Sequence, residues 1–209
     1  MPAADLTGPG LPWHGAGEPR SSFRPGWLAG PASEVARALL GARLVSDVDG
    51  VRTTGVIVET EAYLGPDDPA SHAATRRITP RNRIMFGPPG RAYVYRSYGM
   101  HWCMNVVTGP DGRASAVLIR GLEPLEGREV MARRRGRARP LSSGPGRLCQ
   151  ALGITGQLYG HDLARPPLRL LPGWAVPEAG VAVSGRIGVS RAADRPLRFF
   201  VRESPGVSR

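Results

Sequence analysis

The central part of the chain alternates between apolar and polar residues with the period of two that is typical of β-strands. The longest such run extends from Thr54 through Tyr63, and a short apolar pair, Leu44-Val45, precedes it. Between them stands Asp49-Gly50, a dipeptide that favours a hairpin turn when apolar runs flank it. We therefore expect two antiparallel strands joined near residues 49–50.

A second pair of strands is predicted further along the chain. Residues 92–96 and 102–107 both read as strands, and residues 97–100 separate them by the length of a tight turn. Strand patterns also occur at residues 116–120 and, near the end of the chain, at residues 197–201. These patterns predict a sheet built mainly from hairpins.

Helical patterns flank the strand-rich region. The first helix is expected to have Ser33 as its N-cap and Gly41 as its stop. A second is expected from Pro124 towards Met131, and a third opens at Ser143-Gly144-Pro145. Strands and helices do not alternate regularly, which favours an α+β fold with a largely antiparallel sheet over a doubly wound fold.

The chain length of 209 residues fits one domain. Residues 1–30 are rich in Pro and Gly and show no lasting period, so we interpret them as an irregular leader, followed by one domain over 31–209. Residues 70–90 are polar, Gly/Pro-rich and basic. A loop this long inside a compact domain is usually functional. The stretch from Pro166-Pro167 onward is predicted to be poor in strands.

The net charge of the chain indicates which kind of binding partner to expect. The chain carries 28 basic residues, all arginine, against 17 acidic ones, for a net charge of +11. This balance suggests a polyanionic partner such as nucleic acid, although a genome rich in arginine codons would also produce it. The absence of lysine excludes a lysine Schiff base and a P-loop lysine, so covalent amine chemistry would need the amino terminus.

Metal centres and membrane segments are not expected. The two cysteines, Cys103 and Cys149, form no CxxC pair, and the four histidines lack ligand spacing, so we predict no structural zinc. The two thiols fit a reducing compartment. The amino terminus lacks the pattern of a signal peptide, and no stretch of 18 apolar residues occurs.

Two carboxylates and a phenol share one face of the longest predicted strand. Glu59, Glu61 and Tyr63 alternate with Val58, Thr60 and Ala62, so they point the same way. A carboxylate on a half-buried face has a raised pKa unless cations or donors hold it, and Arg120 at the end of another strand is a candidate partner. The pattern fits either a catalytic carboxylate or a structural Glu–Arg pair.

Aromatic residues form the second cluster. Tyr93 and Tyr95 share one strand face, and core packing accounts for Tyr93, whereas Tyr98 is expected at an exposed hairpin tip. An exposed aromatic beside many arginines suits a wedge between stacked bases, although exposed tyrosines also occur without function. His72, in the irregular stretch after Pro69, is either structural or a donor to a base edge.

The chain resembles the alkyladenine (3-methyladenine) DNA glycosylase family over roughly residues 33–204. The resemblance lies in ordered blocks rather than in one short motif. These blocks are Val58-Glu59-Thr60-Glu61-Ala62-Tyr63-Leu64-Gly65, Ser71-His72, Thr79-Pro80-Arg81-Asn82-Arg83, Met85-Phe86, Tyr93-Val94-Tyr95, Tyr98-Gly99-Met100, Met104-Asn105-Val106, Leu118-Ile119-Arg120, Leu122-Glu123-Pro124-Leu125-Glu126-Gly127 and the segment from Ser143-Gly144-Pro145 through Leu152.

The resemblance implies roles for matching residues. Glu61 corresponds to the general base that activates water, and Arg120 to the arginine near that water. Tyr98 corresponds to the residue that fills the gap left by a flipped nucleotide, with Met100 beside it. Residues implied for the base pocket are Tyr63, His72, Tyr95, Asn105, Leu118 and Val189, and candidate contacts to the DNA backbone are Arg76, Arg77, Arg81, Arg83 and Arg96.

The resemblance also implies a curved, mainly antiparallel sheet with a protruding β-hairpin, and a DNA repair hydrolase. Its substrate would be double-stranded DNA with an alkylated or deaminated purine. Without lysine, we expect a monofunctional enzyme that leaves an abasic site and needs no cofactor or metal. We expect a monomer in the bacterial cytoplasm, associated with the nucleoid.

Two rival interpretations remain open at this point. A non-catalytic nucleic-acid-binding module on the same fold would keep the arginines and Tyr98 but would have no use for Glu61 with Arg120. A formyltransferase-like tRNA-binding domain would not require this set of pocket residues. Glu61→Gln separates the first rival from the enzyme, because only the enzyme would lose base release while it retains binding.

Overall fold

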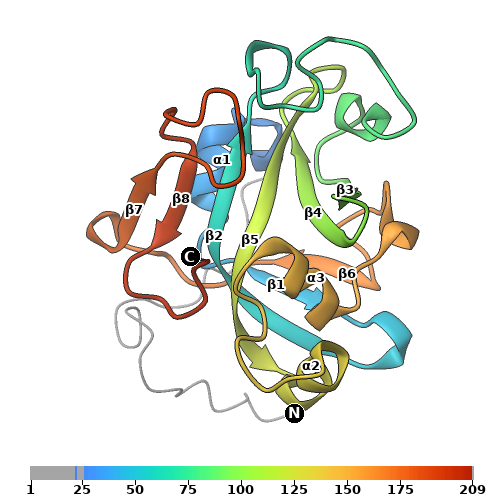
Figure 1. The fold of residues 1–209 in the computed structure, drawn as a ribbon, viewed down its shortest axis with the longest axis vertical. Helices are drawn as coiled ribbons and strands as arrows, with labels where there is room; N and C mark the ends of the chain where they lie inside the picture. Colours follow the sequence, from blue (N-terminus) through green and yellow to red (C-terminus); the bar gives the residue numbers. More distant parts are fainter. Residues whose placement is uncertain (1–21, 23–25, 209) are drawn as a thin grey trace.

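The computed structural model describes residue 22 and residues 26–208 (Figure 1). This part of the chain forms three α-helices and one sheet of eight strands. The helices are α1 (Ala32–Ala38), α2 (Arg128–Arg135) and α3 (Pro145–Leu152). The strands are β1 (Arg43–Ser46), β2 (Thr53–Tyr63), β3 (Ala92–Ser97), β4 (His101–Thr108), β5 (Ser115–Glu126), β6 (Leu168–Leu171), β7 (Val181–Ser184) and β8 (Arg198–Val201).

The sheet confirms the predicted α+β class. Its main order is β3-β4-β5-β2-β1-β6, and all of these neighbours are antiparallel. The long strand β2 pairs with β5 along one edge, while β1 and β8 share its other edge, and β7 extends the sheet from β8. Figure 1 shows β2 and β5 running side by side through the middle of the molecule. Any residue on one face of β2 therefore lies near the centre of the sheet.

The helices cover the sheet at two places. α1 packs against β2, β5 and β8, and the Thr60 hydroxyl donates to the carbonyl of Ala36 at 2.8 Å. α2 and α3 pack on each other, and α3 also packs on β4 and β5 (Figure 1). Most of the buried apolar side chains form one continuous core, and a smaller apolar cluster that includes Met85 and Tyr93 lies beside it.

Both predicted hairpins are present. β1 and β2 are joined through a short 3-10 turn at Val48–Gly50, in which Asp49 and Gly50 adopt positive φ. β3 and β4 are joined at Tyr98-Gly99, and the amide of Met100 donates to the carbonyl of Ser97. The side chains of Tyr98 and Met100 are 86% and 73% exposed, so this second hairpin ends in an apolar tip that faces solvent.

Two predicted helix starts were wrong. Ser33 lies inside α1, because the extended backbone of Pro31 supplies the N-cap. Pro124 lies in β5, which continues to Glu126 because it pairs with β2; the proline sits next to a break in register, a position where a strand tolerates it. Gly127, with φ +72°, then turns the chain into α2.

Regular elements also occur in two stretches that were predicted to lack them, the end of the leader and the part of the chain after Pro166-Pro167. The last residues of the leader, Trp27–Ala29, form a 3-10 helix, and Trp27 and Leu28 pack against the core. Most other leader residues lie outside the described part of the chain. The stretch after Pro166-Pro167 contains β6 and β7, two four-residue strands that are too short to show a clear alternation.

Candidate active site

One row of side chains crosses four neighbouring strands on a single face of the sheet. Tyr93 on β3 pairs with Asn105 on β4, Asn105 pairs with Leu118 on β5, and Leu118 pairs with Glu61 on β2. Directly paired residues of antiparallel strands point to the same side. Sheet register alone therefore brings four sequence-distant side chains together.

A cavity of about 460 Å³ lies on this face. Five of the six residues predicted for the base pocket line it, and so do Tyr93, Tyr98, Arg81 and the Gly188–Arg191 segment. Leu118, the sixth, is buried between Glu61 and Asn105 in the row and does not reach the lining. The five predicted lining residues are Tyr63, His72, Tyr95, Asn105 and Val189.

The aromatic wall of the cavity is held by ring contacts. His72 packs edge-on against Tyr95, with ring centroids 4.6 Å apart, and Tyr93 lies 5.2 Å from Tyr95. A hydrogen bond of 2.7 Å joins Nδ1 of His72 to the hydroxyl of Tyr93. Although His72 is open to the cavity on one side, burial against the tyrosines, together with Arg81, lowers its pKa to about 4, so the ring is neutral at physiological pH.

Asn105 and the tyrosines contribute polar but uncharged groups to the cavity lining. The Asn105 side-chain amide donates to the carbonyl of Tyr93 at 3.0 Å, which fixes its orientation. Burial raises the pKa of Tyr93 to about 12 and also raises the pKa of Tyr63 and of Tyr95. All three phenols therefore stay protonated and present neutral ring faces to the cavity.

Glu61 lies directly beneath the cavity and is completely buried. Its Oε2 accepts from the hydroxyl of Tyr63 at 3.0 Å, and its Oε1 accepts from the backbone amide of Ile187 at 2.7 Å. Nη1 of Arg120 lies 3.3 Å from Oε1. Burial raises the pKa of Glu61, while Arg120 and these two donors act in the opposite direction.

A β-bulge places Arg120 between two carboxylates. On β5, Gly121 pairs with Glu59 and Ile119 pairs with Thr60, so Arg120 is the extra residue. Its Nε lies 3.1 Å from Glu59 Oε1, while Nη1 faces Glu61. A Cβ at Gly121 would come within 2.4 Å of the carbonyl of Gly206, so the bulge requires glycine there.

Glu59 forms the structural pair that sequence analysis left open. It accepts hydrogen bonds from Arg120, from Arg198 Nε at 2.7 Å, and from both the amide and the hydroxyl of Ser208. These contacts attach the end of the described chain to the middle of the sheet. Arg120 is shared, because it is paired with both Glu59 and Glu61.

Arg186 is the principal site residue that the sequence did not reveal. Its buried guanidinium forms two hydrogen bonds with the carboxylate of Asp68 and donates to the carbonyl of Ala62 at 3.1 Å. It also lies 4.8 Å from the ring centroid of Tyr63. Because Ile187 follows directly, Arg186 fixes both a wall of the cavity and the amide that contacts Glu61. Its partner is 118 residues away, so no local pattern indicates the pair.

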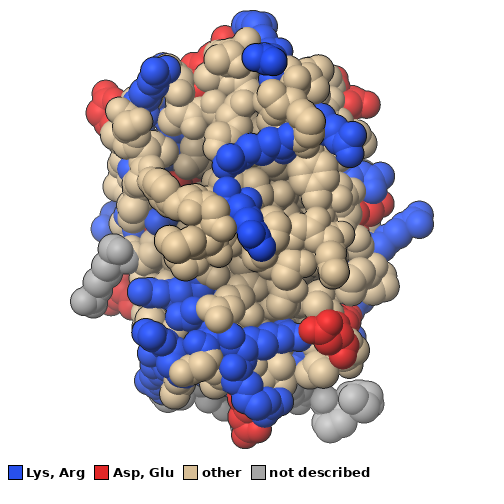
Figure 2. All heavy atoms as spheres, turned by 45° about the vertical axis from the view of Figure 1, so that its right-hand side comes forward, with Lys and Arg blue, Asp and Glu red and all other residues tan. Residues whose placement is uncertain are grey.

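The predicted backbone arginines occupy three different places. Arg76 lies near Asp67, at 3.6 Å, and Arg77 is exposed in the same loop. Arg81 lines the cavity, whereas Arg96 on β3 and Arg83 line a neighbouring hollow. In Figure 2 the right-hand side of Figure 1 is turned towards the viewer. Arginine side chains are spread over the face that is seen, and acidic side chains occur at only a few places on it.

The described residues contain neither a metal site nor a helix that could span a membrane. No group of three or more His, Cys, Asp or Glu side chains is arranged to hold a metal ion there. None of the described helices combines the length and the apolar character needed to cross a bilayer. Both cysteines are buried and unpaired.

This site has the features of an enzyme that acts on a nucleotide: an aromatic cavity, a buried carboxylate beneath it and an exposed apolar hairpin beside it. Comparison with known proteins identifies the family. Residues 26–205 match the family described as "Methylpurine-DNA glycosylase (MPG)". The chain belongs to the methylpurine-DNA glycosylase family, which confirms the resemblance found in the sequence and makes it a DNA glycosylase of alkylated-base repair.

Similar proteins occur in several bacteria, and those compared are named "Putative 3-methyladenine DNA glycosylase". The protein of Granulibacter bethesdensis is 52% identical over 187 residues, which cover 88% of this chain and 85% of the relative. The protein of Nitrosospira multiformis is 51% identical, covering 84% and 88%. One from Rhodopseudomonas palustris is 48% identical, covering 100% and 96%.

Proposed function

We propose that this protein turns an alkylated or deaminated purine nucleotide out of double-stranded DNA into the aromatic cavity and hydrolyses its N-glycosidic bond with Glu61 as general base. In this reaction the water proton passes to the Glu61 carboxylate and the water oxygen bonds to C1′. The C1′–N bond breaks, and its electron pair neutralises the cationic alkylated base; a neutral deaminated base takes up one proton from solvent as it leaves. The product is an intact strand with an abasic site.

The hairpin tip supports a role in opening the duplex. Tyr98 and Gly99 both have positive φ, 50° and 71°, as a type I′ turn requires. Glycine tolerates this conformation, but for tyrosine it costs on the order of 1–2 kcal/mol. A bulky ring held outward at a strained position fits a wedge that stacks in place of the displaced base, with Met100 beside it.

The cavity wall supports selection of damaged purines. An N-alkylated purine carries positive charge, and a tyrosine face attracts a cation by about 0.5–2 kcal/mol per good contact. Tyr63 and Tyr95 line the cavity and stay neutral, and His72 is neutral as well, so Arg81 and Arg191 are the positively charged residues of the lining. We propose that the fixed amide of Asn105, which lines the cavity, obstructs the exocyclic amino group of normal guanine.

Glu61 has no surface open to solvent, so water must gain access for the reaction to occur. The Gly188–Ser190 segment lines the cavity and follows Ile187, whose amide contacts the carboxylate. We infer that entry of the nucleotide shifts this segment and admits one water to Glu61. Before the water arrives, Arg120 would keep its contact with the Glu61 carboxylate and so oppose protonation of that carboxylate.

The single observation that carries this function is the buried carboxylate of Glu61, held by a tyrosine that itself lines the cavity. The direct test is incubation with duplex oligonucleotides that carry 3-methyladenine, hypoxanthine or ethenoadenine, followed by alkaline cleavage. Cleavage only after alkali supports a glycosylase that leaves an abasic site. No cleavage of any of these substrates would contradict the proposal.

The absence of lysine supports a monofunctional enzyme, because glycosylases that also nick the strand usually use an amine nucleophile. Borohydride should therefore trap no protein–DNA adduct during the reaction, and a trapped adduct would contradict this part of the proposal. We further propose that the protein acts as a monomer on DNA in the bacterial cytoplasm, at the nucleoid, and without a cofactor.

A further inference from the structure

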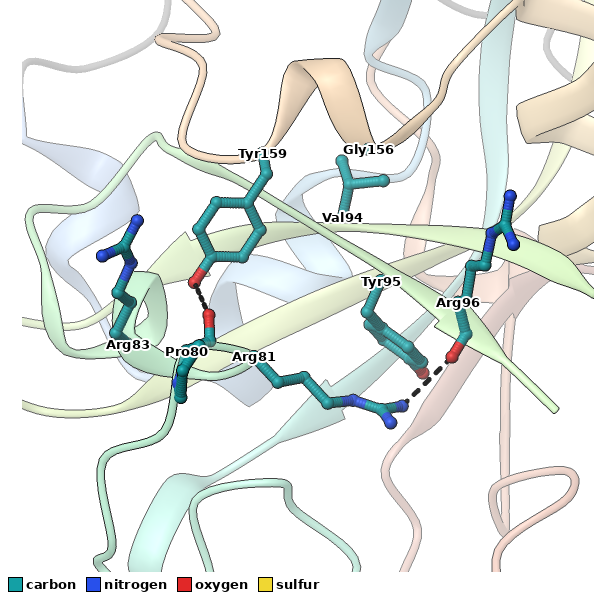
Figure 3. Close-up of a pocket in the computed structure, with 8 residues that line it drawn as sticks. All are labelled: Pro80, Arg81, Arg83, Val94, Tyr95, Arg96, Gly156 and Tyr159. Carbon is teal, nitrogen blue, oxygen red and sulfur yellow. Dashed lines mark hydrogen bonds between the residues drawn. The ribbon is translucent and has the colours of Figure 1, made fainter. Parts of the chain in front are cut away.

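A second hollow, of about 370 Å³, lies beside β3 and shares a wall with the base cavity (Figure 3). Tyr95 and Arg81 line both spaces. The second hollow is also lined by Val94, Arg96 and Tyr159. Three of its eight lining residues are arginines, which sets it apart from the base cavity next to it.

The frame of this hollow is fixed by hydrogen bonds. The Tyr159 hydroxyl donates to the carbonyl of Pro80 at 3.1 Å and accepts from the amide of Ile84 at 3.1 Å. The amide of Gly160 donates to the carbonyl of Ala92, at the start of β3. These bonds join the basic loop to β3 through the 156–160 segment, so the hollow is a built feature of the fold.

The three arginines of the hollow lack acidic partners. Arg81 donates to the carbonyl of Arg96 at 3.3 Å and lies 4.9 Å from the ring centroid of Tyr95. Arg96 lies 4.7 Å from the ring of Trp102, and Arg83 lies 6.0 Å from that of Tyr159. Among the described residues, none of the three has a carboxylate oxygen within 4.0 Å, unlike Arg76 with Asp67.

The positions of these charges indicate the shape of the ligand. Figure 3 shows the side chains of Arg83 and Arg96 at opposite ends of the hollow, with Arg81 reaching in between them. Arg83 and Arg96 therefore suit two separate anionic groups along one strand rather than a single small anion. A cationic groove with aromatic rings is the arrangement that holds a nucleic-acid strand without reading its sequence.

We propose that this hollow is a second DNA subsite, which holds an undamaged nucleotide of one strand with Arg83 and Arg96 on the phosphates at either side of it. This inference rests on the proposed function, because it assumes that DNA approaches along β3, where Tyr98 lies two residues beyond Arg96. Arg81 forms part of the wall between this subsite and the base cavity. The subsite assigns two of the five candidate backbone arginines, Arg83 and Arg96, to one DNA strand. Arg76 does not line this subsite.

The first test is the salt dependence of binding. The probe is a fluorescent duplex with one tetrahydrofuran abasic analogue, which has no base to release, and the proteins are the full chain, R83Q, R96Q and the double variant. Each phosphate contact contributes a slope of about −0.9 to log K against log salt, so each single variant should flatten the slope by about 0.9 and the double variant by about 1.8. R202Q, a change at an exposed arginine after β8, is the matched control and should leave the slope unchanged.

The second test locates the phosphates. Single phosphodiesters of the same duplex are replaced one at a time by neutral methylphosphonates, and affinity is measured for each protein. Replacement of the linkage that Arg83 contacts should weaken binding by the wild type but not by R83Q. Replacement of a neighbouring linkage on the same strand should weaken binding by the wild type but not by R96Q. Slopes that match R202Q, or sensitive linkages on different strands, would overturn the proposal.

The test separates this subsite from the proposed function. Base release by the wild-type chain from a duplex that carries hypoxanthine is measured in parallel. If the wild type releases no base, the proposed function fails whatever the slopes are. If base is released but the R83Q and R96Q slopes equal that of R202Q, only the subsite is rejected.

Discussion

Glu59 and Glu61 stand two residues apart on one face of β2, and both are completely buried, but their surroundings differ. Glu59 accepts four hydrogen bonds, from two arginines and from both donors of Ser208. Glu61 has one arginine, one amide and one phenol, and the phenol belongs to the cavity wall. All donors to Glu59 belong to the folded frame, whereas one donor to Glu61 lines the cavity, and this difference is the basis for proposing Glu61 as the reacting carboxylate.

We infer from this comparison that the hydrogen-bond donors around a buried carboxylate distinguish a structural carboxylate from a reactive one. The four donors of Glu59 occupy most of its lone pairs, and none of these donors belongs to the cavity lining, so little capacity remains to bind a water proton. A carboxylate with a raised pKa and a donor that the ligand can displace is suited to general-base work. Environment separates the roles of two carboxylates in this way in other glycosidic hydrolyses as well.

Glu61→Gln gives the largest expected effect on base release. Loss of the general base should reduce the single-turnover rate by about 10²- to 10⁴-fold, which is the usual contribution of acid–base catalysis. Binding to the abasic-analogue duplex should be retained. Base release at the wild-type rate would remove the contrast between the two carboxylates, and loss of binding would point to a folding defect instead.

Glu59→Gln gives the largest expected effect on stability. Removing one partner of a buried ion pair costs about 3–5 kcal/mol, because Arg120 and Arg198 lose part of their compensation. Chemical denaturation should show this loss of unfolding free energy for E59Q. E61Q should be at least as stable as the wild type above neutral pH. Equal destabilisation by the two substitutions would show that Glu61 is structural too.

Arg186 belongs to the Glu61 side of the comparison, because it contacts the Tyr63 ring and directly precedes Ile187. Burial alone would raise the pKa of Asp68, but bonds from Arg186 and the amides of Leu64 and Ala70 outweigh it and lower that pKa. R186Q should therefore destabilise the fold by about 3 kcal/mol, by removing one partner of a buried pair.

In the same variant, loss of the Ile187 contact should move the acid limb of the rate profile to higher pH. R186K, which keeps the charge, should restore part of both properties. A stability loss with an unchanged pH profile would mean that Arg186 does not position Glu61.

Tyr98→Asn has the smallest expected effect on stability. Asparagine tolerates positive φ better than tyrosine, so unfolding free energy should stay level or rise by up to about 1 kcal/mol. Base release from duplex DNA should nevertheless fall, because the wedge is lost. Unchanged release by Y98N would show that the exposed ring has no role in opening the duplex.

Local patterns predicted the hairpin and the carboxylate face correctly. Tyr98-Gly99 between two alternating runs is readable as a turn, and the spacing of Glu59, Glu61 and Tyr63 follows from strand geometry. Pro124 was assigned to a helix because the pairing that keeps it in β5 is tertiary. Local propensity cannot detect such pairing.

The long-range contacts of the site could not be predicted from the sequence. The partners of Glu59 include Arg198 and Ser208, which lie 139 and 149 residues away. Core packing was expected for Tyr93 and is confirmed, because the residue is buried in a second apolar cluster; its place on the cavity wall beside His72 was not predicted. The family resemblance implies roles for single residues, but it does not indicate the buried ion pair between Arg186 and Asp68.

The pH dependence of stability provides a check on Glu61 that is independent of DNA. Its pKa is higher in the folded chain than the ordinary value of 4.5, so its favourable contribution is present at low pH and is lost as pH rises through the folded pKa. Glutamine does not titrate. The unfolding free energy of E61Q relative to the wild type should therefore increase over that pH range.

The most direct measurement of the central claim is the single-turnover rate of hypoxanthine release as a function of pH, for the wild type and E61Q. The account predicts an acid limb in the wild type at a pH above the ordinary carboxylate value, and its absence in a much slower E61Q. The two proteins showing the same limb and comparable rates would contradict the assignment of Glu61 as the general base.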